Sequence, residues 1–429
     1  MIVKRFLIIW AGEFVSSIGS GMTAFAVTVY MYQLTGSVTM VSVVALLAFL
    51  PMILLSPVGG LLADRYDRRL MMILGDSLSV IGLLIIFIAA DGGAVGVLPI
   101  CIGVTLNSIF VSLLDPAYRA TITDLLGEDE YARASGLVQV AANSKYLLSP
   151  FIAGIILSVS DIRVILLLDM ATVLVTVLTI ALVRKDIPIS RPAKGKLGFI
   201  QEFNEGFKSI TSDKGVSSLV LLMAFMCFFI AFIQTLMTPM ILAFADTKTL
   251  GFIESLSAVG MLIGSVVIGI INTTKNHSKI LTISLVAAGV FMALTGTTTT
   301  IWLLVIFCML FFTALPFVNT SADVLIRSKI PNEVQGRAWG IISLLTQIGF
   351  VAAYGVCGVL ADHVFEPMLV EGGILTGSIG RFIGIGEGRG IGLMISISGM
   401  VMVSFACIFG SRKSIREMER SGSHEMVID

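Results

Sequence analysis

Twelve long apolar runs follow one another along the 429-residue chain, and they constrain its fold more than any other feature. Most have the roughly 20 residues that an α-helix needs to cross the hydrocarbon core of a bilayer. Strands of a membrane barrel would be shorter and would alternate in polarity, so the runs predict helices. They lie at 6–32, 38–62, 70–90, 97–119, 135–158, 164–183, 216–244, 252–271, 280–294, 301–326, 338–360 and 390–409.

The composition excludes a soluble protein. Hydrophobic residues make up 56% of the chain and charged residues only 13%, whereas soluble domains carry about 25% charged residues. A soluble chain of this length and composition could not cover its surface with polar groups. We therefore expect an all-α membrane protein with twelve transmembrane helices.

The distribution of basic residues predicts the orientation of the chain in the membrane. An even number of spans places both termini on one side. If that side is the cytoplasm, twenty-three of the 28 Lys and Arg residues lie in inner loops and tails, and four lie in outer loops. The remaining one, Lys145, falls inside a span. Because inner loops are enriched in Lys and Arg, we expect a cell-membrane protein with cytoplasmic N- and C-termini.

A polar segment at 184–215 divides the chain near its middle. Its second part repeats apolar residues at helical spacing, which predicts an amphipathic helix on the inner leaflet. The stretches "EDEYARASGLVQV" and "NEVQGRAWGIISL" match at a constant offset of 204, which pairs Arg133 with Arg337. We therefore expect two pseudo-symmetric six-helix halves at 1–183 and 216–410, a linker at 184–215 and a cytoplasmic tail at 411–429.

The turn between the second and third runs carries a recognisable motif, "GLLADRYDRR". It resembles the helix 2–3 signature of the major facilitator superfamily, with Asp67 at a position where Gly is usual. The stretches at 10–37, 115–122 and 384–393 are similar to the drug-exporting branch that includes macrolide efflux proteins. The resemblance covers nearly the whole chain.

The resemblance implies a conformational latch at this turn. In the family fold, Asp64 would face the N-terminus of the helix that begins near Arg337, where a carboxylate is stabilised by the helix dipole. The alternative is a solvated turn whose charges serve only to fix topology. The residues assigned to the latch are Gly60, Asp64, Arg65, Arg68, Arg69 and Arg337.

Two family features are only partly matched. The stretch "SKYLLSPFIAG" is similar to the antiporter signature of exporting members, but only Pro150 and Gly154 match well. Many proton-driven exporters carry an arginine inside their fourth helix, whereas Arg119 lies at the inner end of the fourth run. The sequence therefore gives no support to proton coupling through that arginine.

Charged side chains at bilayer depth are costly and mark functional sites. They are Glu13, Asp76, Asp115, Lys145, Asp169 and Asp323. We predict that Glu13 is the proton-coupling site, with Asp115 second and Lys145 as the partner. A permanent structural ion pair is the alternative. In the family fold the helices that carry Asp76 and Asp169 support the bundle from outside, so those two are interpreted as structural.

Polar residues in spans assigned to the central helices are predicted to line the substrate cavity. They are Asn107, Asn143, Gln234, Asn319, Asp323 and Gln347.

The remaining motifs argue against enzymes, metals and cofactors. The five cysteines all lie in apolar runs without a CxxC pair, and the three histidines are scattered, so no metal site is expected. "GIGEGRG" follows no strand, and no Walker, HExxH or GxSxG motif is present. We expect no cofactor, no ATP hydrolysis and no nucleic-acid partner.

These observations predict a secondary active exporter of hydrophobic or amphiphilic small molecules. It would work as a monomer, by proton antiport, through rocking of its two halves. Two alternatives stay open: an exporter of a dedicated metabolite such as a siderophore, and a non-transporting membrane sensor with the same fold.

Overall fold

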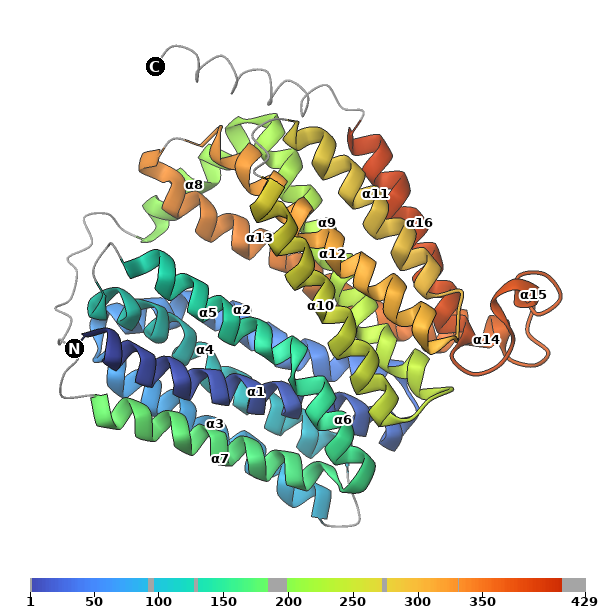
Figure 1. Ribbon diagram of the computed structural model, residues 1–429, viewed down its shortest axis with the longest axis horizontal. Helices are drawn as coiled ribbons and strands as arrows, with labels where there is room; N and C mark the ends of the chain where they lie inside the picture. The colour runs from blue at the N-terminus through green and yellow to red at the C-terminus, as the bar shows by residue number, and fades with distance from the viewer. Residues whose placement is uncertain are drawn as a thin grey trace. The chain divides into compact units, whose positions relative to one another are not determined.

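The computed structural model describes residues 2–91, 96–126, 130–183, 199–271, 276–330 and 332–410. Over these residues the regular structure is entirely helical (Figure 1), and twelve helical stretches are long and apolar enough to cross a membrane. This confirms the predicted all-α, twelve-span fold class. The first part of the predicted linker and the predicted tail lie outside the described residues.

The chain divides into two compact units. Unit 1 comprises Met1–Lys194 and Ala245–Ser255, and unit 2 comprises Gly195–Phe244 and Leu256–Asp429. The short segment 245–255, at the start of α10, thus belongs to unit 1.

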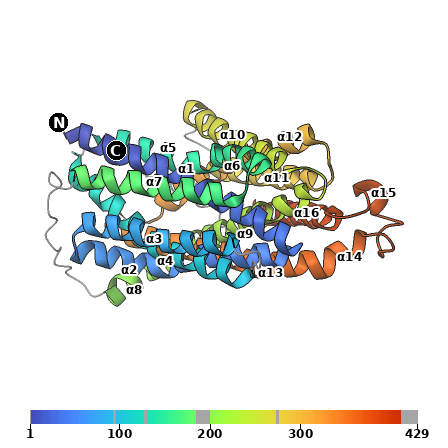
Figure 2. The same cartoon turned by 90° about the horizontal axis from the view of Figure 1, so that it is seen from below.

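In unit 1 the first helix packs against α5, α6 and α7, while α4 packs against both α2 and α3. Figure 2 shows α2, α3 and α4 side by side. The helices are α1 (Ile2–Thr35), α2 (Val38–Arg65), α3 (Arg68–Asp91), α4 (Val97–Leu125), α5 (Tyr131–Leu147), α6 (Ser149–Val159) and α7 (Ile162–Val183).

In unit 2 α9 packs against α13 and α16, and α11 packs against α12 and α16. The ninth span is longer than the sequence predicts, and a π-helix extends the eleventh. The helices are α8 (Phe199–Ser212), α9 (Lys214–Leu242), α10 (Thr247–Ile271), α11 (His277–Thr295), α12 (Ile301–Arg327), α13 (Asn332–Leu360), η3 (Ala361–Phe365), α14 (Glu366–Leu369), α15 (Gly380–Ile383) and α16 (Arg389–Gly410).

Local residues fix several helix ends. Gly36 turns the chain after α1 with a φ of 60°, a conformation that favours glycine. Ser37 then caps α2, because its hydroxyl accepts a hydrogen bond from the backbone N–H of Met40 at 3.3 Å. Asp213 caps α9 in the same way through the N–H groups of Gly215 and Val216. These caps satisfy donors that have no partner inside the helix.

The fifth span is broken, whereas the sequence predicts one continuous helix at 135–158. The break falls between Leu147 and Ser149. Pro150 explains it, because proline has no N–H to donate to the preceding turn. The N–H of Phe151 instead donates to the hydroxyl of Ser255 at 3.0 Å, which ties α6 to the start of α10 within unit 1.

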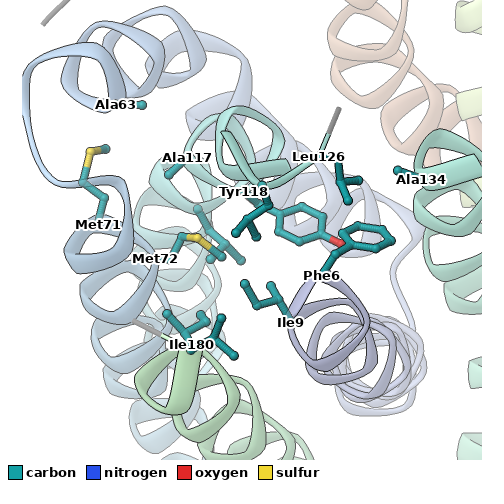
Figure 3. Close-up of a cluster of buried hydrophobic side chains, with 13 residues drawn as sticks. Phe6, Ile9, Ala63, Met71, Met72, Ala117, Tyr118, Leu126, Ala134 and Ile180 are labelled. Carbon is teal, nitrogen blue, oxygen red and sulfur yellow. The ribbon is translucent and has the colours of Figure 1, made fainter. Parts of the chain in front are cut away.

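A hydrophobic cluster fills one end of unit 1 (Figure 3). Side chains from α1, α2, α3, α4, α5 and α7 converge there, and each is at least nine-tenths buried. This packing fixes the ends of the helices whose middle turns carry the polar residues described below. Its labelled members are Phe6, Ile9, Ala63, Met71, Met72, Ala117, Tyr118, Leu126, Ala134 and Ile180.

Glycines allow the helix backbones to approach closely, as is usual in membrane bundles. A Cβ on Gly82 of α3 would lie 2.7 Å from the backbone nitrogen of Asn107 in α4. Likewise, a Cβ on Gly103 of α4 would lie 2.6 Å from the carbonyl oxygen of Gly82. The contact between α3 and α4 is therefore a backbone contact, and it leaves little freedom for the residues beside it.

Candidate functional site

A polar cavity of about 120 Å³ lies inside unit 1, among helices that are otherwise apolar. Five helices contribute to it, namely α1, α3, α4, α5 and α7. Polar side chains dominate its lining, although apolar residues close part of it. The lining residues are Glu13, Ser16, Ser17, Ser20, Asp76, Ser79, Leu83, Asn107, Val111, Leu114, Lys145, Asp169 and Val173.

The first helix presents a polar stripe to this cavity. Glu13, Ser16, Ser17 and Ser20 are spaced by three, four and seven residues, so they share one face of α1. Small residues flank the stripe and let the neighbouring helices approach. The hydroxyl of Thr176 in α7, for example, donates to the carbonyl oxygen of Gly12 at 3.2 Å.

Asp169 of α7 is 2% exposed and is held by surrounding hydroxyl groups. Thr172 lies on the next turn, with its hydroxyl 3.4 Å from the carboxylate. Ser20 and Thr23 of α1 face the same carboxylate, which also interacts electrostatically with Lys145. A Cβ on Gly19 would come within 2.8 Å of one carboxylate oxygen, so only glycine leaves room for Asp169 there.

Asp76 of α3 is 3% exposed and lies among other acids. It interacts electrostatically with Glu13 and Asp169. Ser79 is one turn further along the same helix, and its hydroxyl donates to the backbone carbonyl of Asp76 at 2.7 Å. The amide nitrogen of Asn107 in turn donates to the backbone carbonyl of Ser79 at 3.3 Å.

Lys145 of α5 is the one basic side chain in the cavity lining. Its aliphatic stem packs against α1, where a Cβ on Gly21 would lie 2.9 Å from its Cγ. Three carboxyl groups and one amino group thus line the same small cavity. Such a cavity can bind a cation, or take up and release protons, because the acids outnumber the base.

The structure brings Glu13 and Lys145, two of the three predicted proton-coupling residues, into one cavity. The side chain of Asp115 lies outside the part of the chain that the structure describes. Asp76 and Asp169 line the cavity as well, although the sequence interpretation assigns them a supporting role. The periodic spacing of Asp76 and Ser79 on one face of a helix was the available signal for a site in α3.

Only Asn107 of the six predicted substrate-cavity residues lines this cavity. Asn143 of α5 accepts a hydrogen bond from Gln139 at 3.1 Å. The other four belong to unit 2, where Asp323 lies 4.0 Å from Arg327, Gln234 and Asn319 are exposed and Gln347 is partly buried.

The α2–α3 turn is organised by its own arginines. Arg69 donates to both carboxylate oxygens of Asp67, at 2.8 and 2.7 Å, and Arg68 donates to the carbonyl oxygen of Ala63 at 3.0 Å. Asp67, the departure from the family motif, is therefore a partner of Arg69. A Cβ on Gly60 would have open space around it. The side chains of Asp64, Arg65 and Arg337 lie outside the described part, so the latch stays a prediction.

The antiporter-like stretch of the fifth span makes close contacts within unit 1. The hydroxyl of Ser149 donates to the carbonyl oxygen of Ile18 at 2.9 Å. Gly154 lies against the start of α10, where its Cβ would be 3.3 Å from the Cα of Gly251. Pro150 and Gly154, the two residues that match the signature, thus lie at a helix break and at a backbone contact.

The segment "GIGEGRG", at 384–390, forms the turn that leads into α16. Gly384, Gly386 and Gly388 all have positive φ angles, which explains the repeated glycines. The carboxylate of Glu366 accepts hydrogen bonds from the N–H groups of Gly388 and Ile391 and so caps this helix. The glycines therefore serve the turn before a capped helix start.

The sequence model of the Major Facilitator Superfamily matches residues 9–354. The chain belongs to this superfamily of membrane transporters. It is 28% identical to Macrolide efflux protein A of Streptococcus pyogenes over 365 residues, which are 84% of this chain and 90% of that protein. It is 23% identical to the enterobactin exporter EntS of Escherichia coli over 346 residues, 78% of this chain and 80% of that protein.

Solved structures show the same fold. The nucleoside transporter NupG superposes with a TM-score of 0.70 at 15% identity, covering 95% of this chain and 100% of that one. The family resemblance drawn from the sequence is thereby confirmed. The chain is a multi-pass membrane transporter for a small-molecule substrate rather than an enzyme.

Proposed function

We propose that the chain is a secondary active exporter of hydrophobic or amphiphilic small molecules of the macrolide type. Transport would proceed by proton antiport and alternating access. The observation that carries this proposal is that Glu13 and Lys145 line one polar cavity inside an apolar bundle. The efflux function in the name of the relative from Streptococcus pyogenes supports the direction and the substrate class.

Glu13 is the proposed proton site. A carboxyl group that has lost most of its water can change its protonation state when its surroundings change slightly. Lys145 compensates the charge of the ionised carboxyl, so the cavity tolerates both protonation states. Asp115, the second proposed acid, lies two turns of α4 away from Asn107 in sequence and offers a proton path along that helix.

Exposed amides in unit 2 support a water-containing substrate cavity. Gln234 in α9 and Asn319 in α12 are exposed although both lie within candidate membrane spans. An amide that faced lipid would lose its hydrogen bonds to water, at a cost of several kcal/mol in order of magnitude. We therefore place these two residues, with Asp323 and Gln347, on the substrate path.

The excess of Lys and Arg in alternate loops supports an orientation with both termini in the cytoplasm. In that orientation the α2–α3 turn lies at the cytoplasmic face of the cell membrane. Asp64 would then act as the inner latch, and Asp64→Asn would keep substrate binding but slow the alternation between inward- and outward-facing states. Normal alternation in that variant would remove the latch from the mechanism.

The test is dye efflux in inverted membrane vesicles with an imposed pH gradient. The intact chain should move a lipophilic dye only while the gradient lasts, and Glu13→Gln should abolish the movement. Glu371→Gln, at an exposed position outside the spans, is the matched control and should transport normally. Full gradient-dependent movement by Glu13→Gln would exclude Glu13 as the proton site.

Export of a dedicated metabolite is the second candidate, because the enterobactin exporter of Escherichia coli is also a relative. In that case neither the intact chain nor the variant would move dye. Radiolabelled siderophore in the same vesicles would then accumulate in a gradient-dependent way.

A further inference from the structure

We infer that the cavity of unit 1 contains a binding site for a small monovalent cation, sodium, with the carboxylate of Asp76 as its charged ligand. The site lies beside Glu13 but is separate from it. It goes beyond the proposed function, because binding of sodium there does not depend on which molecule the chain exports.

The carboxyl group of Asp76 has little charge compensation among the described residues. Its side chain is 3% exposed, and its Oδ2 atom is fully buried with no hydrogen-bond partner among the described residues. The charged groups that act on it are the acids Glu13 and Asp169. Asp169, in contrast, is surrounded by hydroxyls and by Lys145. A buried carboxylate oxygen without a donor is costly unless a cation or a proton neutralises the carboxylate.

Two polar side chains that line the cavity near Asp76 already use a donor elsewhere. The hydroxyl proton of Ser79 is already donated to the backbone of Asp76 at 2.7 Å, so the lone pairs of that oxygen remain for a ligand. The amide N–H of Asn107 donates a hydrogen bond to the carbonyl oxygen of Ser79 at 3.3 Å. The amide oxygen of Asn107 therefore remains as an acceptor for a ligand. Oxygen ligands of this kind suit hard cations.

Charge and size limit which cation fits. The lining holds three acids and one base, so it can accept positive charge. Among the described residues, however, no group of three or more His, Cys, Asp or Glu side chains could hold a metal ion together. A single carboxylate with neutral oxygens matches a monovalent ion better than a divalent one. A volume of about 120 Å³ leaves room for a small ion with a few water molecules.

The site is built on a rigid part of the unit. Asp76, Ser79 and Asn107 lie on α3 and α4, whose backbones touch at Gly82 and Gly103. A Cβ on Gly82 would meet both the backbone nitrogen and the Cβ of Asn107, at 2.7 and 2.9 Å. Ligands carried by packed helices keep their positions better than ligands on loops.

The test measures thermal unfolding of the purified full-length chain in detergent. Sodium, potassium and choline chloride are compared at equal ionic strength and alkaline pH. A ligand that binds only the folded state raises Tm as its concentration rises. We expect Tm to increase with the logarithm of the sodium concentration, and not with choline. Asp76→Asn should lose this shift while unfolding at an equal or higher Tm in choline, because it removes a buried uncompensated charge.

Two further variants keep the test decisive if Asp76→Asn folds poorly. Asn107→Leu keeps the side-chain shape and removes the amide oxygen, so it should raise the sodium concentration needed for half of the shift at least tenfold. Glu371→Gln, at an exposed acid of unit 2 outside the spans, should leave the shift unchanged. An equal shift in all three salts, or a sodium-specific shift that survives in Asp76→Asn, would overturn the site.

This outcome is separate from that of the export experiment. Dye efflux driven by a pH gradient without a sodium-specific shift would refute the sodium site and keep the exporter. A sodium-specific shift without dye efflux would keep the site and count against the proposed substrate class.

Discussion

Replacement of Gly82 by alanine tests the backbone contact between α3 and α4, which positions Asp76 and Asn107. The added Cβ would lie 2.7 Å from the backbone nitrogen of Asn107 and 2.9 Å from its Cβ, and it would also meet the carbonyl oxygen of Gly103. Ordinary van der Waals contact begins at 3.4 Å. Backbone atoms cannot rotate away, so the two helices must separate by roughly 0.5–1 Å, which forfeits a quarter to a half of their dispersion energy at that point.

The expected magnitude is the difference between two opposing effects. Overpacking of a tight contact costs about 1–3 kcal/mol, whereas alanine is favoured over glycine in a helix by about 1 kcal/mol. Gly82→Ala should therefore lower the free energy of unfolding by up to about 2 kcal/mol. The sodium-dependent rise in Tm should shrink as well, because Asn107 moves with the displaced helix.

The assay is reversible unfolding in mixed micelles of a mild and a denaturing detergent. Gly136→Ala is the control, since that glycine lies within α5 in the same unit and a Cβ there meets no atom within 4 Å. It should be neutral or stabilising by up to about 1 kcal/mol. If both variants unfold at the same detergent ratio, α3 and α4 do not meet at backbone distance and the reasoning fails.

Three further predictions concern single contacts. Glu366→Ala should cost about 1–2 kcal/mol in the same unfolding assay, because α16 loses its cap, while Glu371→Ala at an exposed position should cost nothing measurable. Ser149→Ala should cost about 1 kcal/mol through the lost bond between α6 and α1, and an unchanged value would mean that this bond does not stabilise the folded chain. Hydrogen bonds from Arg163 lower the pKa of Asp161 below its usual 3.8, so their contribution is present above that value and fades as the pH falls through the lowered one. Both groups are partly exposed, so Arg163→Gln should cost under about 1 kcal/mol at neutral pH, and a pH titration of unfolding should show that the cost vanishes in strong acid.

The fold was predictable because membrane helices carry their signal in local composition. Each span must satisfy its own backbone inside hydrocarbon, so a long apolar run has few alternatives to a helix. The helix break between Leu147 and Ser149 was harder to predict from the sequence, and Pro150 is its only local signal. Proline is tolerated in membrane helices when a neighbour takes up the freed backbone group. Here that neighbour is Ser255, which is 104 residues away along the chain.

The candidate site was predictable in part, for the same physical reason. Glu13 and Lys145 stand out in the sequence because a charged side chain at bilayer depth is energetically costly and usually marks a functional site. Whether Asp76 and Asp169 face the same space depends on how α3 and α7 are rotated. That rotation is set by close contacts such as those of Gly19 and Gly82, which appear in the sequence only as glycines. Helix rotation is a tertiary property, and an amphipathic pattern is too weak in an apolar helix to reveal it.

The first membrane-spanning helices of the two units, α1 and α9, differ in a way that bears on how an exporter couples ions to substrate. α1 places Glu13 and three serines on one face, toward the interior of unit 1. α9 carries no acidic or basic residue between Val216 and Leu242, and its Phe225 packs on α16, where the ring centroids of Phe225 and Phe405 are 4.0 Å apart. A cation that binds or leaves can change the electrostatic energy of only those elements whose charges lie near it. Substitutions in unit 1 should therefore change the dependence of transport on ions. Gln234→Leu in α9 should change which substrates are moved and leave the sodium shift and the dependence on the pH gradient intact. A loss of either dependence in that variant would show that the ion site draws on both units.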